Sequence, residues 1–204
     1  MVGLEQLRSD SVAMSRASSG TGEQLVEVAV RCFLRDGWID MRAFAVEAGV
    51  GRATVYRHLG ARDDVLGEVL WTLTQRSLDS ARRVTRAAGT TGAEAVLATL
   101  RRSMTDVVSL PALRRLLDRD PETALRVLTS KDGVVQARVV GVIEQLVLDE
   151  MGPPHGITSA ALAYAITRVA ESFCYSDVIA GQAPDIESAS AIIGRLLTED
   201  TVRN

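Results

Sequence analysis

The spacing of three residues, Ala45, Gly49 and Val55, places the strongest constraint on what this chain can fold into. Two short helices cross closely only when a small side chain lies at the crossing, and Ala45 provides one. Gly49 follows four residues later and suits a tight turn, because glycine adopts positive φ without strain. Val55, six residues further on, is then placed to point inward and hold the second helix. The spacing predicts a helix-turn-helix, with helices at 41–48 and 52–58.

The same stretch begins GVGRAT (residues 49–54) and invites a second interpretation, a glycine loop that cradles phosphate. A dinucleotide fingerprint needs GxGxxG between a strand and a helix, but the third glycine position is Thr54 and the preceding pattern is helical. The Walker pattern GxxxxGK[ST] is absent, as are a nucleophile–base constellation and a metal-ligand cluster. We therefore expect no cofactor, no metal and no enzymatic activity.

The rest of the chain indicates an all-α protein. Only five residues are proline and 4% are aromatic, so long segments are free to form Ala/Leu/Val-rich helices, and no strand alternation is found. A first helix is expected to begin with a capping box of Thr21 and Gln24 and to end at Gly37. Further helices are predicted at about 61–86, 93–108, 111–118, 121–129, 132–151, 157–180 and 186–198.

Charge and hydropathy limit the class of protein further. The net charge of −3 excludes a generally basic nucleic-acid coat, but residues 42–62 hold four arginines against one glutamate. No apolar run approaches the length of a membrane span or a signal peptide, so we expect a soluble, cytoplasmic protein with no membrane partner. The two cysteines, Cys32 and Cys174, fit buried free thiols in a reducing compartment.

Residues 21–71 resemble the DNA-binding domain of TetR-family transcriptional regulators. The motifs that carry the resemblance are Gly37-Trp38, FAVEAGV (residues 44–50), GRATVYRHL (residues 51–59) and Arg62-Asp63 at the start of the fourth helix. The sequence departs from the family pattern where Asp40, Gly51 and Leu59 replace the usual Thr, Ser and Phe. Residues 1–20, rich in Ser, Gly, Met and Arg with weak periodicity, are expected to form a disordered arm. The resemblance implies a helix-turn-helix domain at 21–66 and a helical ligand-binding and dimerisation domain at 67–204.

The resemblance also implies two groups of contacts with a double-stranded DNA operator. The residues that match phosphate-contacting positions are Thr54, Tyr56, His58 and Arg62. The candidates for reading base edges are Arg52, Ala53 and Arg57. Arg42 is expected to take over the phosphate contact that an acidic Asp40 cannot make. Alternative roles stay open: a core or hinge position for Tyr56, an exposed helix end for His58, and a solvated charge for Arg42.

The C-terminal half is expected to bind a small, largely apolar effector and to form a homodimer, as the family does. The candidate ligand contacts are Leu100, Met104, Leu113, Leu117, Leu125, Val139, Val142, Arg168, Glu171, Ser172 and Tyr175. The apolar members could equally be ordinary core, and Arg168 with Glu171 could be an internal ion pair that organises the bundle. The expected dimer contacts are Ala160, Ala161 and Tyr164, on a helix that is apolar or small nearly all round.

The function expected from these features is a repressor that an effector, of acyl-chain or lactone type, releases from its operator. The alternative is a DNA-binding or helical adaptor protein without small-molecule input. A cavity among the C-terminal helices would distinguish the two, because only the first needs one.

Overall fold

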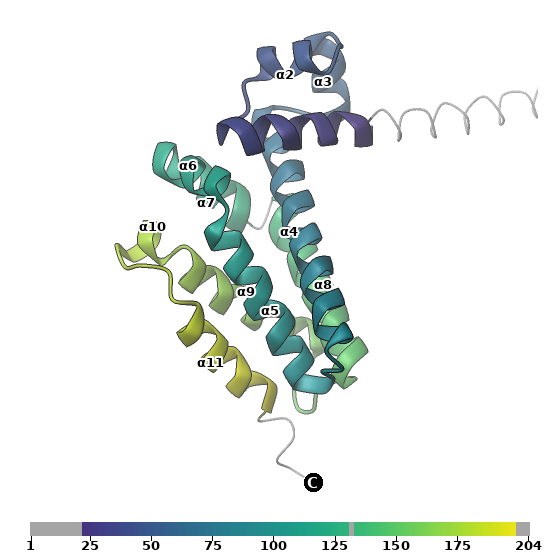
Figure 1. Ribbon diagram of the computed structural model, residues 1–204, viewed down its shortest axis with the longest axis vertical. Helices are drawn as coiled ribbons and strands as arrows, with labels where there is room; N and C mark the ends of the chain where they lie inside the picture. Colours follow the sequence, from purple (N-terminus) through teal and green to yellow (C-terminus); the bar gives the residue numbers. More distant parts are fainter. Residues whose placement is uncertain (1–21, 131–132, 199–204) are drawn as a thin grey trace, which may run out of the picture.

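The computed structural model describes residues 22–130 and 133–198, and every regular element within these ranges is a helix (Figure 1). The all-α prediction is therefore confirmed. The predicted arm at 1–20 and the capping residue Thr21 lie outside the described residues. None of the described helices combines the length and apolarity needed to cross a membrane.

Three short helices form a small N-terminal unit, which we call the head: residues 22–36, α2 (Met41–Glu47) and α3 (Arg52–Leu59). The first of them buries Leu25, Ala29, Cys32 and Phe33, which share one face at helical spacing. It ends at Gly37, whose φ of +70° lies in the left-handed region that favours glycine.

The long helix α4 (Arg62–Ala87) leads from the head into a bundle. The bundle contains α5 (Gly92–Ser109), α6 (Pro111–Arg119), α7 (Pro121–Thr129), α8 (Val134–Met151), α9 (Ser159–Cys174), α10 (Ser176–Ala180) and α11 (Ile186–Thr198). In it α4 packs on α5 and α8, α9 packs on α8 and α11, and α11 also packs on α5. The short helices α6 and α7 lie between the head and the rest of the bundle (Figure 1).

One predicted helix, 157–180, is divided in two by the structure. The helix α9 stops at Cys174 because Tyr175 leaves helical geometry, with φ −114° and ψ 21°. The hydroxyl of Ser176 then donates to the carbonyl oxygens of Phe173 (3.1 Å) and Ala183 (3.0 Å), which ties the break to the following loop. The chain turns here, and Tyr175 faces the interior of the bundle.

Candidate nucleic-acid interface and ligand cavity

The first helix of the helix-turn-helix is capped by Asp40. Its carboxylate oxygen accepts from the backbone amides of Arg42 (2.8 Å) and Ala43 (2.9 Å). The hydrogen bond from Ala43, followed by that from Arg42, holds the pKa of Asp40 below its ordinary value. The carboxylate is thus committed to the helix terminus, while the exposed side chain of Arg42 forms no ion pair within the described part of the chain.

The turn between the two helices has the geometry that the spacing predicts. Gly49 has φ +67°, and the amide of Val50 donates to the carbonyl of Ala45 at 3.1 Å. Ala45 is 3% exposed and Val55 is 0% exposed, so the crossing point and the inward residue of α3 are both buried. Phe44 fills the space between them. This small core fixes which side of α3 faces outward.

The outward face of α3 consists of Arg52, Ala53, Tyr56 and Arg57, all exposed, flanked by the half-buried Thr54 and His58. Tyr56 is 46% exposed, so its ring is not part of the core. A guanidinium nitrogen of Arg57 lies 3.3 Å from Nε2 of His58. Arg52 has no ion pair or side-chain hydrogen bond among the residues described. The face therefore presents two guanidinium groups, a phenol and a methyl group to an approaching molecule.

Arg62 lies apart from this face. Its guanidinium carbon is 4.2 Å from the centroid of the Trp38 ring, and that of Arg119 is 4.6 Å from the same ring. Asp63 is 3.6 Å from Nε of Arg62. The structure thus places Arg62 at the junction of the head with α6, and a phosphate contact by Arg62 stays a prediction.

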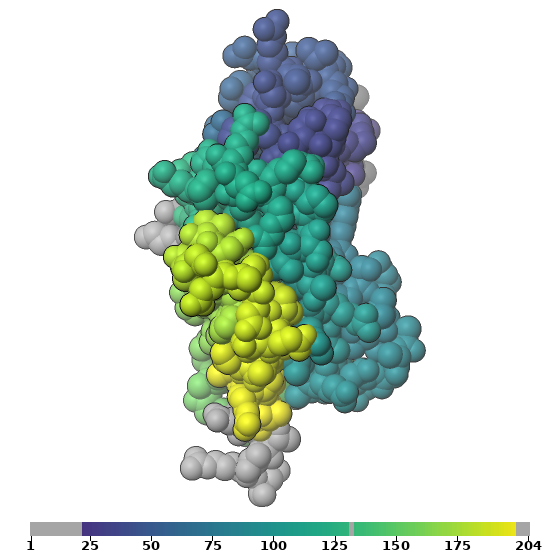
Figure 2. All heavy atoms as spheres, turned by 60° about the vertical axis from the view of Figure 1, so that its left-hand side comes forward, coloured from purple at the N-terminus to yellow at the C-terminus, as the bar shows by residue number. Residues whose placement is uncertain are grey.

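The junction continues along α6. A guanidinium nitrogen of Arg115 donates to the carbonyls of Leu34 (3.0 Å) and Arg35 (3.2 Å), the last turn of the first helix. A Cβ at Gly37 would lie 2.6 Å from Cβ of Arg115, so α6 approaches the head as closely as a glycine permits. Figure 2 shows α6 and α7, in teal to green, directly against the purple first helix. The sequence pattern does not predict this junction, because Arg115 and its partners are about 80 residues apart and only Gly37-Trp38 is a recognisable motif.

Two adjacent cavities lie inside the bundle. The first has a volume of about 80 Å³, is lined by residues of α4, α5, α7, α8 and α9, and is partly open to solvent. The second, of about 110 Å³, extends from it toward α6, past Leu110 and Leu113. The two share four wall residues: Thr74, Val107, Leu128 and Tyr175. Tyr175 is thus part of the wall of both cavities.

The structure brings some of the predicted ligand contacts to these cavities and leaves others elsewhere. The first cavity is lined by Leu100, Met104, Val139, Glu171 and Tyr175 among the predicted residues, and the second by Leu113 and Tyr175. The walls of these two cavities do not include Leu117, Leu125, Val142, Arg168 or Ser172. The first cavity is also lined by Thr74 and Leu78, which extend the inward stripe of α4, and by Ser103, which follows Leu100 by three residues; helical spacing could have indicated all three.

The polar end of the first cavity is formed by Glu171. Its carboxylate accepts from Arg168, one turn earlier on α9, at 2.6 Å. The side chain of Glu171 is 13% exposed and that of Arg168 is 43% exposed, so the carboxylate lies inside and the guanidinium outside. Burial raises the pKa of Glu171 to about 7 although Arg168 opposes the shift. Gln136, in the amide orientation that satisfies its neighbours, accepts from Arg168 at 2.7 Å and donates to the carbonyl of Thr129.

The outer side of α9 carries the predicted dimer residues. Ala160 and Ala161 are exposed, and Tyr164 is 54% exposed despite its large apolar ring. On the neighbouring helix α8, Gly141 is exposed and a Cβ there would meet nothing within 4 Å. Small residues beside an exposed aromatic ring leave room for a close approach of another helix.

A basic, outward recognition helix, a helix-turn-helix core and a bundle with an internal cavity together define a DNA-binding transcriptional regulator. Residues 91–198 match the family model described as "Tetracyclin repressor-like, C-terminal domain". The chain belongs to the TetR family of transcriptional regulators.

Solved structures agree with this assignment. The chain is similar to the transcriptional repressor QsdR of R. erythropolis, from the TetR family, with 27% identity and a TM-score of 0.76 over 88% of this chain and 95% of that one. It shares its fold with the TetR-family repressor AlkX of Dietzia sp. strain DQ12-45-1b, with 18% identity and a TM-score of 0.65 over 86% and 94% of the two chains. A search of curated proteins finds no match.

Proposed function

We propose that this protein is a repressor that binds a symmetric operator as a homodimer and leaves it when a small, largely apolar effector occupies the bundle cavities. The observation that carries the proposal is the outward face of α3, where Arg52 is exposed while Val55 is fully buried beneath it. QsdR and AlkX, whose solved structures this chain resembles, are both described as repressors.

In this proposal α3 enters the major groove. Arg52 and Arg57 bridge O6 and N7 of guanine, and the methyl group of Ala53 touches thymine. Contacts to backbone phosphates come from Thr54, Tyr56, His58 and Arg42, and these position the head without reading sequence. Arg42 is suited to this role because Asp40 is engaged by the α2 amides, which leaves the guanidinium as the cation at this corner.

A single head of this size reads few base pairs, so we infer that two act together. Two-fold related heads read half-sites separated by about one helical turn, roughly 34–36 Å. The exposed face of Ala160, Ala161 and Tyr164 on α9, beside Gly141 on α8, is the proposed contact with the second copy. That contact would form a four-helix bundle from α8 and α9 of each subunit and fix the separation of the heads.

The effector acts through α6. The second cavity borders this helix at Leu113, while Arg115 and Arg119 on the same helix hold the head through backbone carbonyls and the Trp38 ring. A molecule that fills the cavity and displaces α6 therefore changes the orientation of the head. An effector releases DNA only if it binds the displaced state more tightly than the operator-bound state.

The proposal is tested by selecting bound sequences from a pool of random duplexes with the purified full-length protein. The expected product is one two-fold symmetric sequence, and binding of it should fall steeply with salt. A pool that remains random after several rounds would contradict a sequence-specific repressor. The cavities favour the ligand-responsive function over an adaptor without small-molecule input, because an adaptor needs no internal volume beside its DNA-binding junction.

A further inference from the structure

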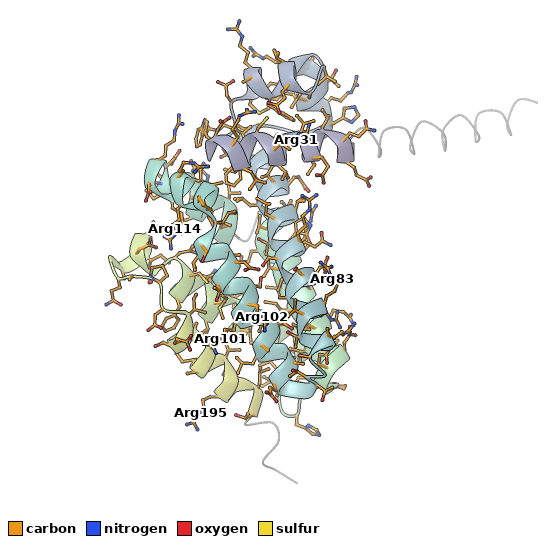
Figure 3. The ribbon with its side chains drawn as sticks, in the orientation of Figure 1. Arg31, Arg83, Arg101, Arg102, Arg114 and Arg195 are labelled. Carbon is orange, nitrogen blue, oxygen red and sulfur yellow. The ribbon has the colours of Figure 1, made fainter. Side chains whose placement is uncertain are left out.

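The charged groups that line the two cavities are carboxyl groups. Among the described residues, their walls contain the carboxyl groups of Glu171 and Asp106 but no arginine, lysine or histidine. Two arginines near the walls already have partners: Arg168 pairs with Glu171, and Arg114 pairs with Asp177 where α6 approaches α10 (Figure 3). An anionic ligand would therefore meet carboxyl groups and no available cation.

The cations of the surrounding helices face outward. Arg101 and Arg102 of α5, labelled in Figure 3, are both exposed, although Leu100 and Met104 of the same helix line the first cavity. Arg101 pairs with Glu187 of α11. The helix thus keeps the positive charge of these two residues at the surface.

Tyr175 supplies a hydrogen-bond donor without a partner. Its residue is 7% exposed and lies in the wall of both cavities, and its hydroxyl makes no hydrogen bond with any described residue. By contrast, the hydroxyl of Thr167 donates to the Ala163 carbonyl at 2.8 Å, and that of Ser103 accepts from Ser77 at 3.1 Å. A hydroxyl that lines a cavity and has no protein partner among the described residues is free to donate to an acceptor that a ligand brings.

We propose that the effector is an uncharged molecule with an apolar body and a carbonyl oxygen, such as a ketone or an ester, which accepts a hydrogen bond from Tyr175, and that the site rejects the corresponding carboxylate. The inference rests on the proposed effector function and specifies its ligand. An amine gains little here, because it would have to compete with Arg168 for the Glu171 carboxylate. The raised pKa of Glu171, about 7, shows that the wall disfavours negative charge even with Arg168 beside it.

The volumes indicate the size of a suitable probe. The two adjacent cavities, of about 80 and 110 Å³, are together comparable with the roughly 150 Å³ cavity that accepts a benzene-sized ligand. We therefore choose three probes with eight carbons: 2-octanone, octanoate and octylamine. They share an apolar chain and differ in the charge of the head group.

Binding of each probe to the full-length protein is measured by calorimetry at pH 8, and release of the selected operator is measured separately by fluorescence anisotropy. We expect octanoate to bind at least about a hundredfold more weakly than 2-octanone. A carboxylic acid has a pKa some four units below the pH of the measurement, so octanoate must either take up a proton or be buried as an unpaired anion. Octylamine is expected to bind more weakly than the ketone. Octanoate or octylamine binding as tightly as the ketone would overturn the inference, as would a ketone that does not bind.

The two readouts separate this inference from the proposed function. A ketone that binds selectively but leaves the operator bound contradicts the effector role alone and supports the charge selection. A carboxylate that binds tightly and releases DNA supports the effector role and overturns the charge selection.

Two variants identify the groups responsible. Tyr175→Phe should weaken the binding of 2-octanone about fivefold, because one neutral hydrogen bond is lost. The ligand-free variant should melt no lower than the wild type, because the hydroxyl has no hydrogen bond to lose within the described part of the protein.

Glu171→Gln should strengthen the binding of octanoate, relative to that of 2-octanone, at least about tenfold, because it removes the negative charge that faces the ligand. Glu94→Gln, the same change at an exposed position of α5, is the matched control and should leave the ratio unchanged. If Glu171→Gln also leaves the ratio of octanoate affinity to 2-octanone affinity unchanged, the proposed role of that carboxyl group is overturned.

Discussion

The guanidinium carbon of Arg119 lies 4.6 Å from the centroid of the Trp38 ring, so the last turn of α6 is stacked on the residue that follows the first helix of the head. Arg62, at the start of α4, lies 4.2 Å from the same centroid. The indole ring of Trp38 therefore contacts two cations, one from α4 and one from α6. Any movement of α6 relative to α4 must change this stack.

Replacing Arg119 with alanine should loosen the head without unfolding the bundle. A cation–π contact at a partly exposed site contributes about 0.5–1 kcal/mol. We expect amide hydrogens of residues 22–36 to exchange up to about fivefold faster in Arg119→Ala, and those of α8 to be unaffected. Hydrogen exchange with mass spectrometry measures both. Arg83→Ala removes an exposed arginine of α4 and serves as the control (Figure 3). Equal acceleration in the control would refute a specific role for the stack.

Arg52→Ala should relax the preference for one base pair of each half-site. The expected loss on the selected operator is about 1–3 kcal/mol, with a much smaller loss on a duplex already changed at that base pair. Arg42→Ala should instead weaken every duplex alike and lower the salt slope by about one per head. Anisotropy titrations on operator variants at several salt concentrations distinguish the two patterns. A uniform loss on all sequences for Arg52→Ala would remove it from the base-reading group.

Tyr164→Glu should weaken the proposed dimer. A charge placed at the centre of an apolar helix contact is buried without a partner, and we expect the dimer dissociation constant to rise at least about tenfold. Sedimentation velocity over a range of concentrations gives that constant. Ile179→Glu introduces the same charge on α10, where the replaced side chain is 58% exposed. If both variants dissociate equally, or neither does, the dimer does not use the outer face of α9.

Glu171 should make the stability of the fold depend on pH. Burial raises its pKa to about 7 in the folded chain, above the value near 4.5 expected when unfolded. Its contribution to stability is therefore fully present below about pH 4.5 and is lost as the pH rises to about 7, by up to about 3 kcal/mol. Glu171→Gln should melt at a temperature that changes less over this window, measured by calorimetry in steps of half a pH unit. Parallel curves for the two proteins would show that Glu171 ionises normally.

The sequence was sufficient to predict the helix-turn-helix, because its determinants lie within eleven residues. Ala45, Gly49 and Val55 interact through the turn they build, so their spacing carries the geometry. Helical period and proline positions also placed 121–129 and 186–198 within the boundaries that the structure has. Local periodicity could not reveal that Tyr175 ends α9, because the hydrogen bonds that stabilise the break involve Ala183 in the following loop.

The candidate site was harder to predict, because its parts come from distant segments. Periodicity marks Leu100 and Leu117 alike as inward, yet of the two only Leu100 lines either of the two cavities described above. A void depends on how five helices meet, and no single stretch contains that information. The contacts of Trp38 with Arg119 and of Leu34 with Arg115 could not be predicted from local sequence either, because each joins the head to a helix about 80 residues away.

The contact between Gly37 and Arg115 has a consequence for building hybrid regulators. Residue 37 is restricted twice, by its φ of +70° and by the atoms of α6 that occupy the space where a side chain would lie. A head taken from this protein carries half of a fitted surface, and the other half remains on α6. A chimaera that exchanges heads between regulators should therefore exchange residues 22–36 and α6 as one unit. If only the residues before α4 were exchanged, the new head would contact an α6 whose side chains do not fit it.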